Sequence, residues 1–190
     1  FSLMKGVADF PYVTYLFAFD KVVVAKALDG PSDMRGEDFI GKIVQMPFEI
    51  PAVEPYSLLR MWKRQLAKLH VDPDTDVSEQ DRWAEISQQG VAPLMRTPRD
   101  AIRLGNVLLG TYAAVRGEVN FADFVAIEAL RLFCPSVYQA ILDYPTKFTG
   151  EGRKSEEKEP LRRFHDELLD NVESNQRAAT GVILRKLFPK

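Results

Sequence analysis

Two apolar runs near the start of the chain predict buried β-strands. Residues 12–19 carry almost no charge and are rich in aromatic and β-branched side chains, which is typical of a strand buried on both faces. Residues 43–50 form a second run, and its Pro47 favours a place at the margin of a sheet, because proline donates no ladder hydrogen bond. Short helices are predicted between the runs, over residues 21–28 and 37–42. A strand, a helix and a second strand suit a parallel crossover, so this part of the chain is predicted to be α/β.

From Pro55 onward the apolar residues recur at helical spacing. The most clearly marked helix starts at Thr97, which we expect to be its N-cap, with Pro98 in the first helical position and Asp100 as the acid of a capping box. The other predicted helices cover residues 56–70, 78–89, 120–133, 135–144 and 161–188.

The pattern therefore divides the chain into four segments. Residues 1–54 are expected to form an α/β fragment, and residues 55–148 and 161–190 are expected to be helical. Residues 149–160 contain no large apolar side chain and are predicted to be a linker. Two strands alone do not make a stable sheet, so the remaining strands are expected upstream of Phe1. The chain has no initiator methionine, and we interpret it as a piece of a longer protein.

Composition and charge exclude several classes of site. The 25 basic and 27 acidic side chains give a net charge of −2, which does not indicate a general polyanion binder but leaves room for a local basic face. A single cysteine, Cys134, excludes an internal disulfide and a cysteine-cluster metal site, and two histidines make a zinc centre unexpected. No apolar run approaches the ~20 residues of a membrane helix.

Asp20 directly follows the first predicted strand. A carboxylate at the carboxyl end of a buried strand lies where open α/β sheets bind ligands. The alternative is that Asp20 caps the helix that begins at Lys21, and the two roles are compatible.

The helix that starts at Thr97 carries Arg99, Arg103 and Asn106 at spacings of four and three residues, hence on one face. A guanidinium group matches phosphate oxygens with a bidentate fork, so this face is a candidate anion site. The alternative on periodicity alone is a solvated arginine face.

Several segments together resemble the KAP family of P-loop NTPases, which have an AAA+-like or STAND-like core. The segments that carry the resemblance run in the family's order along almost the whole chain: residues 8–20, 38–51, 97–100 with Arg103 and Asn106, 117–124, 126–130 and 187–189.

The resemblance implies that the chain is the carboxyl-terminal part of such an NTPase, with the last core strands followed by a helical lid. Asp20 would take the sensor position after the Walker B strand. Arg99 or Arg103 would lie near the nucleotide in a sensor-2-like position, with Asn106 beside them. Lys42 or Arg35 would supply the finger charge that a neighbouring subunit receives.

The resemblance also implies ATP and Mg²⁺ as cofactors of the full-length protein. The Walker A and Walker B motifs of the family are not found in these residues, so we expect this truncated domain alone not to hydrolyse ATP. The implied partners are the upstream half of the same NTPase domain and further copies of the chain in a homo-oligomer. The sequence carries no strong signal for nucleic-acid binding, because its aromatic residues do not alternate with basic ones as in a platform for single strands. The implied location is the cytoplasm or the cytoplasmic face of a membrane. The alternative function is a helical module that binds a protein or a nucleic acid without nucleotide.

Overall fold

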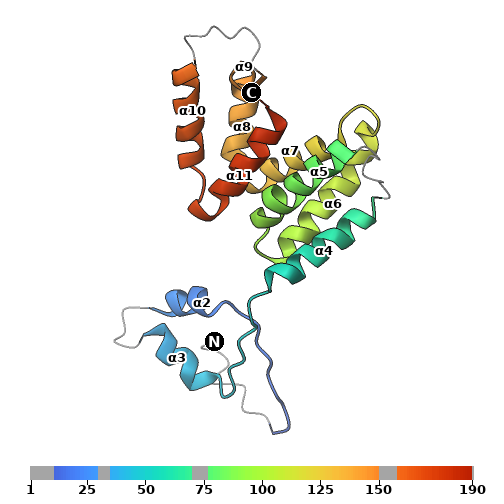
Figure 1. Cartoon of the computed structure of the whole chain (residues 1–190). Helices are drawn as coiled ribbons and strands as arrows, with labels where there is room; N and C mark the ends of the chain where they lie inside the picture. The colour runs from blue at the N-terminus through green and yellow to red at the C-terminus, as the bar shows by residue number, and fades with distance from the viewer. Residues whose placement is uncertain (1–10, 30–34, 70–76, 150–157, 190) are drawn as a thin grey trace. The chain divides into compact units, whose positions relative to one another are not determined.

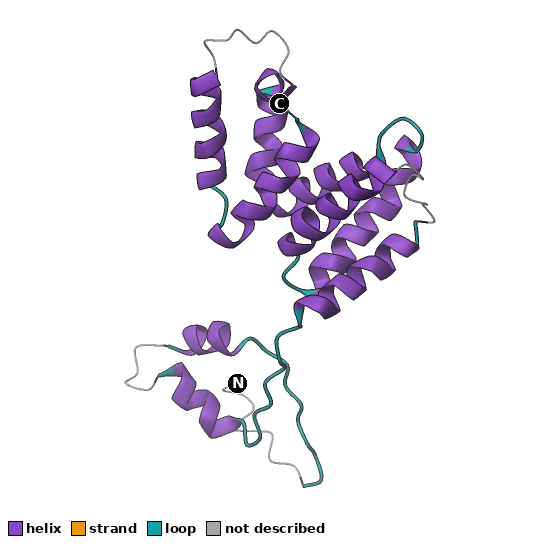
Figure 2. Ribbon diagram, in the orientation of Figure 1, coloured by secondary structure: helices purple, strands orange, loops and turns teal. Residues whose placement is uncertain are grey.

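The computed structural model describes residues 11–29, 35–69, 77–149 and 158–189. Every regular element in these four ranges is helical (Figure 2). The chain divides into two compact units, Phe1–Pro51 and Ala52–Lys190, which are described separately.

The first unit contains helices α2 (Lys21–Leu28) and α3 (Gly36–Ile43) (Figure 1). The two helices meet at Gly36, where an added Cβ would lie 2.0 Å from the carbonyl oxygen of Ala25. The amide of Gly36 also donates to the carboxylate of Asp29 at 2.7 Å. Glycine at this position therefore lets the backbone of α3 begin directly against α2.

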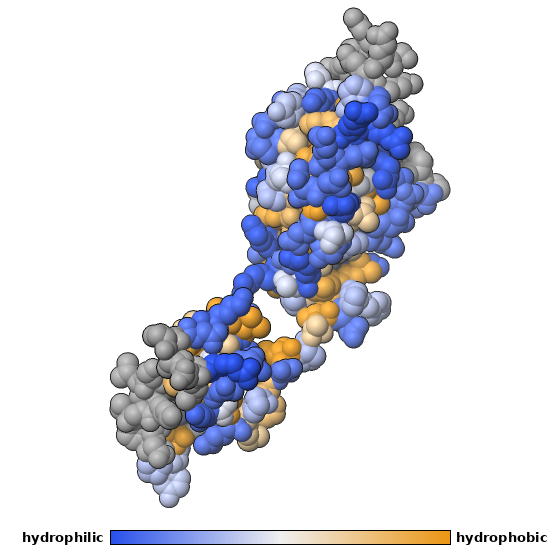
Figure 3. All heavy atoms as spheres, turned by 90° about the vertical axis from the view of Figure 1, so that its left-hand side faces the viewer, coloured by the Kyte–Doolittle hydropathy of each residue, from blue (hydrophilic) through white to orange (hydrophobic). Residues whose placement is uncertain are grey.

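The expectation of an α/β fragment is wrong. Residues 13–19 and 47–54 have no assigned helix or strand, and no β-strand occurs among the described residues. An extended segment becomes a strand only when a neighbour accepts and donates its ladder hydrogen bonds, and here no described segment does so. Several apolar side chains of the predicted strands are consequently exposed, with Leu16 at 94%, Phe48 at 81% and Ile50 at 91%. Apolar patches on the part of the chain that carries α2 and α3 are visible in Figure 3.

The second unit is all-helical. Its α-helices are α4 (Pro55–Ala67), α5 (Val77–Glu85), α6 (Pro98–Val115), α7 (Phe121–Phe133), α8 (Pro135–Asp143), α9 (Pro145–Thr149), α10 (Lys158–Asp170) and α11 (Ser174–Leu187). Between α5 and α6 the chain forms a π-helix, η1 (Ile86–Val91), and a 3₁₀ turn, η2 (Ala92–Leu94).

Two helix starts predicted from the sequence, at residues 97 and 120, are confirmed. Thr97 accepts from the amide of Asp100, the Asp100 carboxylate accepts from the amide of Thr97, and Pro98 opens α6. Asn120 caps α7 through two backbone amides.

One predicted helix end and one predicted continuous helix are wrong. The helix predicted for residues 78–89 is α-helical only to Glu85 and continues as the π-helix η1, which includes Gly90. The helix predicted for residues 161–188 is broken into α10 and α11.

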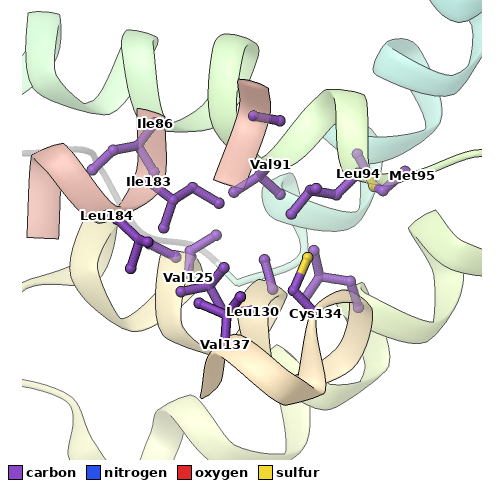
Figure 4. Close-up of a cluster of buried hydrophobic side chains, with 14 of the residues drawn as sticks. Ile86, Val91, Leu94, Met95, Val125, Leu130, Cys134, Val137, Ile183 and Leu184 are labelled. Atoms are coloured by element: carbon purple, nitrogen blue, oxygen red, sulfur yellow. The ribbon is translucent and has the colours of Figure 1, made fainter. Parts of the chain in front are cut away.

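One apolar core joins the helices of this unit (Figure 4). Ile86 and Val91 of the π-helix lie against Ile183 of α11, and all three are fully buried. Trp62 of α4, also fully buried, donates from Nε1 to the hydroxyl of Ser87 at 3.2 Å. The π-helix is thus fixed on both sides, by an apolar contact with α11 and by a hydrogen bond with α4.

Within the described ranges, no single helix has both the length and the apolar composition that a membrane crossing requires. Helices α7 and α8 reach that length and composition only as a pair, with a bend of 117° between them.

Candidate functional site

The outer face of α6 forms an open hollow of about 670 Å³. Among the described residues, its lining side chains come from this one helix, and they are Arg99, Ile102, Arg103, Asn106 and Val107. The structure therefore brings the three site residues predicted on this helix to one surface. Within the described part of the chain, α6 therefore supplies one wall for a bound molecule.

Packing of the opposite face of α6 fixes the direction in which the hollow opens. Ala101, Leu104 and Leu108 are fully buried in the core. Gly105 brings α6 close to α4, since an added Cβ would lie 2.6 Å from the Cβ of Gln65. With one side of α6 held in this way, Arg99 and Arg103 are left exposed on the other.

Neither Arg99 nor Arg103 has an ion-pair or hydrogen-bond partner among the described residues. The carboxylate nearest in sequence, Asp100, is occupied, because its Oδ2 accepts from the amides of Arg96 at 3.0 Å and Thr97 at 2.9 Å. The hollow therefore carries two positive charges that the described part of the chain does not neutralise.

In the first turn of α6, an anion is favoured beside the helix, next to the arginines, and disfavoured at the amino-terminal tip of the helix. Among the first-turn amides, that of Asp100 donates to Thr97 Oγ1 at 3.2 Å, and Pro98 has no N–H. The amide of Arg99 has no partner in the described ranges. The Asp100 carboxylate lies at the helix end and would repel a second anion there, whereas Arg99 and Arg103 attract one to the side.

Asp20 is a helix cap. Its Oδ1 accepts from the amides of Val22 at 2.9 Å and Val23 at 3.1 Å, which satisfies two free donors at the start of α2. The segment before it forms no strand, so Asp20 does not lie at the tip of a β-strand as the sequence suggested. A sensor role for Asp20 stays a prediction.

The two candidate finger residues lie at opposite ends of α3. Lys42 is exposed in its last turn. Arg35 precedes its first residue and pairs with Asp38 at 3.4 Å, and this hydrogen bond raises the pKa of the Arg35 guanidinium. Neither assignment as a finger is tested by this arrangement.

The cysteine and one of the two histidines of the chain, Cys134 and His165, take part in packing contacts. Cys134 is 3% exposed, as expected of a small buried side chain, and its Sγ lies 3.3 Å from Thr180 Oγ1. Burial raises the pKa of the Cys134 thiol. His165 stacks on Phe148 with ring centroids 5.1 Å apart. His70 and most of the predicted linker lie outside the described residues.

Sequence reasoning did not identify the two apolar residues of the hollow, Ile102 and Val107. Their spacing of three and eight residues from Arg99 was the available signal, because it places them on the same helical face.

The profile of the KAP family P-loop domain matches residues 1–115, which end at the last residue of α6 and include every lining residue of the hollow. The chain is also 27% identical over 166 residues to the "Phage T7 exclusion protein" of Escherichia coli (strain K12). That alignment covers 82% of this chain and 22% of the relative, so the chain spans about a fifth of the relative's length. No solved structure matches the chain significantly. Since the family profile covers more than half of its residues, the chain belongs to the KAP family of P-loop NTPases.

Proposed function

We propose that this chain is the sensor-and-lid portion of an ATP-dependent NTPase, and that α6 contacts the bound nucleotide through Arg99, Arg103 and Asn106. Family membership supports a nucleotide-related function. The role of α6 is our inference from the site.

The observation that carries the proposal is the pair of unneutralised guanidinium groups in the hollow of α6. Arginine forks bind phosphate oxygens bidentately, and a hydrogen bond to a charged group contributes about 1.5–3 kcal/mol. The side-chain amide of Asn106 adds a neutral donor and acceptor one turn further along the helix. Ile102 and Val107 give the same surface an apolar part, as ligand pockets usually have.

A site whose described lining comes from one helix suits a lid, which closes over a nucleotide that another part of the protein holds. Phosphoryl transfer needs a phosphate cradle and a metal ion. In the described ranges, no group of three or more His, Cys, Asp or Glu side chains is placed to hold a metal ion. The guanidinium groups fit the phosphates of ATP, whereas we assign Mg²⁺ binding and hydrolysis to other parts of the full-length protein.

Movement of α6 would reach the carboxyl-terminal helices through its first turn. Arg96, just before the helix, pairs with Glu173 at 2.6 Å in the turn between α10 and α11. The amide of Arg96 donates to Asp100 inside α6. This connection is the route by which nucleotide-dependent closure would act as a conformational switch.

Substitution of the two arginines in the full-length protein tests the proposal. We expect Arg99→Ala or Arg103→Ala to weaken ATP binding or to slow turnover by roughly ten- to a hundred-fold, because each 1.4 kcal/mol of lost interaction is about a factor of ten. Binding is measured by calorimetry and turnover by phosphate release.

Arg162→Ala is the matched control, because Arg162 is exposed on α10 and does not line the hollow. The control is expected to keep wild-type ATP affinity and turnover. Unchanged affinity and turnover in both single variants and in the double variant would remove α6 from the nucleotide site.

A further inference from the structure

Helix α4 has an exposed face with three basic side chains, and the helix contains no acidic residue. Its residues Pro55–Ala67 include Arg60, Lys63 and Arg64, which are all exposed. Lys63 and Arg64 follow Arg60 by three and four residues, so each of them lies beside Arg60 on the helix surface, with Cβ atoms about 5–6 Å from that of Arg60. Tyr56, which is 70% exposed, lies one turn before Arg60 on the same face. The face defined by these four residues is called the α4 basic face below.

Packing holds the α4 basic face outward. The apolar side of the helix is buried, with Leu58 at 7% exposure and Trp62 at 0%. Trp62 is fixed by its hydrogen bond to Ser87, and Gln65 is in contact with α6 at Gly105. The basic side chains therefore project from a helix that cannot rotate without breaking the core.

The three cations have no structural role within the described part of the chain. None of Arg60, Lys63 and Arg64 has an ion-pair or hydrogen-bond partner there. By contrast, Arg82 pairs with Asp123 and Arg131 pairs with Glu128. The overall charge of −2 hides this local excess of positive charge.

We propose that the α4 basic face binds the phosphate backbone of a single-stranded nucleic acid, with Tyr56 stacking on a base. Three neighbouring cations match a ligand whose negative charges repeat at short intervals, and two of the three are arginines, which bind phosphate bidentately. An exposed aromatic ring beside a row of cations provides the stacking surface that single strands use. The proposal uses none of the residues that we assign to the nucleotide.

The chemistry of the face fits a nucleic acid better than a membrane or a protein. A helix that lies in a membrane surface inserts an apolar face, but the apolar residues of α4 are turned into the core. A protein interface needs an apolar centre, and Tyr56 is the one large apolar side chain of this face.

The test measures binding of the full-length protein to a fluorescein-labelled single-stranded DNA of mixed sequence, by anisotropy over a series of salt concentrations. We expect the triple variant R60Q/K63Q/R64Q to bind about tenfold more weakly or worse. The slope of log K against log salt should fall in magnitude by about 2, since each lost phosphate contact on a single strand removes about 0.7. Tyr56→Leu should weaken binding about fivefold with little change in that slope.

The control is K26Q/R162Q/R185Q, which removes the same charge from exposed positions on three other helices. This variant should bind the DNA as the wild type does. The α4 triple variant should keep its ATP affinity, and its helix content by circular dichroism should be unchanged, because glutamine is a good helix former. Equal weakening by both triple variants would overturn the proposal, because it would indicate diffuse charge attraction. The proposal would also be overturned if the wild-type protein bound phosphatidylserine vesicles but not DNA, and if the α4 triple variant lost this vesicle binding.

Discussion

Two glycines of α6 have opposite surroundings, and the difference fixes how closely α4 can approach. An added Cβ at Gly105 would lie 2.6 Å from Cβ and 2.8 Å from Cγ of Gln65. An added Cβ at Gly110 would meet nothing within 4 Å. Close packing of α4 against α6 therefore requires a glycine at Gly105, whereas Gly110 has room for a side chain.

Gly105→Ala is expected to destabilise the protein by about 1–3 kcal/mol, because α4 must move away from α6 or Gln65 must leave its place. Urea unfolding followed by circular dichroism measures this change. The control, Gly110→Ala, should be neutral or stabilising by up to about 1 kcal/mol, because alanine favours the helix and restricts the unfolded chain. Equal stability of the two variants would contradict the close contact between α4 and α6.

Helix α6 begins with a capping box that is expected to stabilise its first turn. Thr97 and Asp100 exchange side-chain and backbone hydrogen bonds there, at 3.2 Å and 2.9 Å. Thr111 lies later in the same helix and donates its hydroxyl to the carbonyl of Val107 at 2.8 Å. One threonine thus caps the start of the helix, and the other lies inside it.

Thr97→Ala should cost about 0.5–2 kcal/mol, because it removes the side-chain acceptor of the Asp100 amide and leaves that amide only the backbone carbonyl of residue 97. Thr111→Ala should be neutral or slightly stabilising, because threonine is a poorer helix former than alanine and gains little from bonding its own helix. Thermal unfolding of both variants measures the difference. A larger loss for Thr111→Ala than for Thr97→Ala would show that the capping box contributes little.

The start of α6 could be predicted because its signals are local. A cap, a proline and an acid within four residues specify a helix start, and an apolar stripe specifies the buried face. The π-helix could not be predicted in this way. Its place depends on tertiary contacts, which include the Trp62 bond to Ser87 and the approach of Gly90 to Ile183, where an added Cβ would lie 2.6 Å away.

The errors in the predicted fold have the same cause, because elements that depend on contacts between distant parts of the chain cannot be read from a local sequence pattern. Helices close their own hydrogen bonds, so periodicity identified most of the α-helices from Pro55 onward, although it missed α9 and the break between α10 and α11. A strand needs a neighbour, and the apolar runs at 12–19 and 43–50 have no partner strand in the described ranges. The candidate site was accessible to prediction because helical spacing alone places Arg99, Arg103 and Asn106 together.

Hydrogen exchange of the backbone amides tests this fold. Residues 45–53 donate no backbone hydrogen bond to another described residue, and the side chains of Met46, Phe48 and Ile50 are exposed. We expect their amides to exchange at rates close to those of an unfolded chain. Amides of α6 around Leu104 and of α11 around Ile183 should exchange slowest, because both regions are hydrogen-bonded and fully buried. Mass spectrometry of peptides from the exchanged protein measures both groups. Strong protection of residues 45–53 would show that this segment is paired as a strand, in conflict with its exposed side chains and with its lack of backbone hydrogen bonds to other described residues.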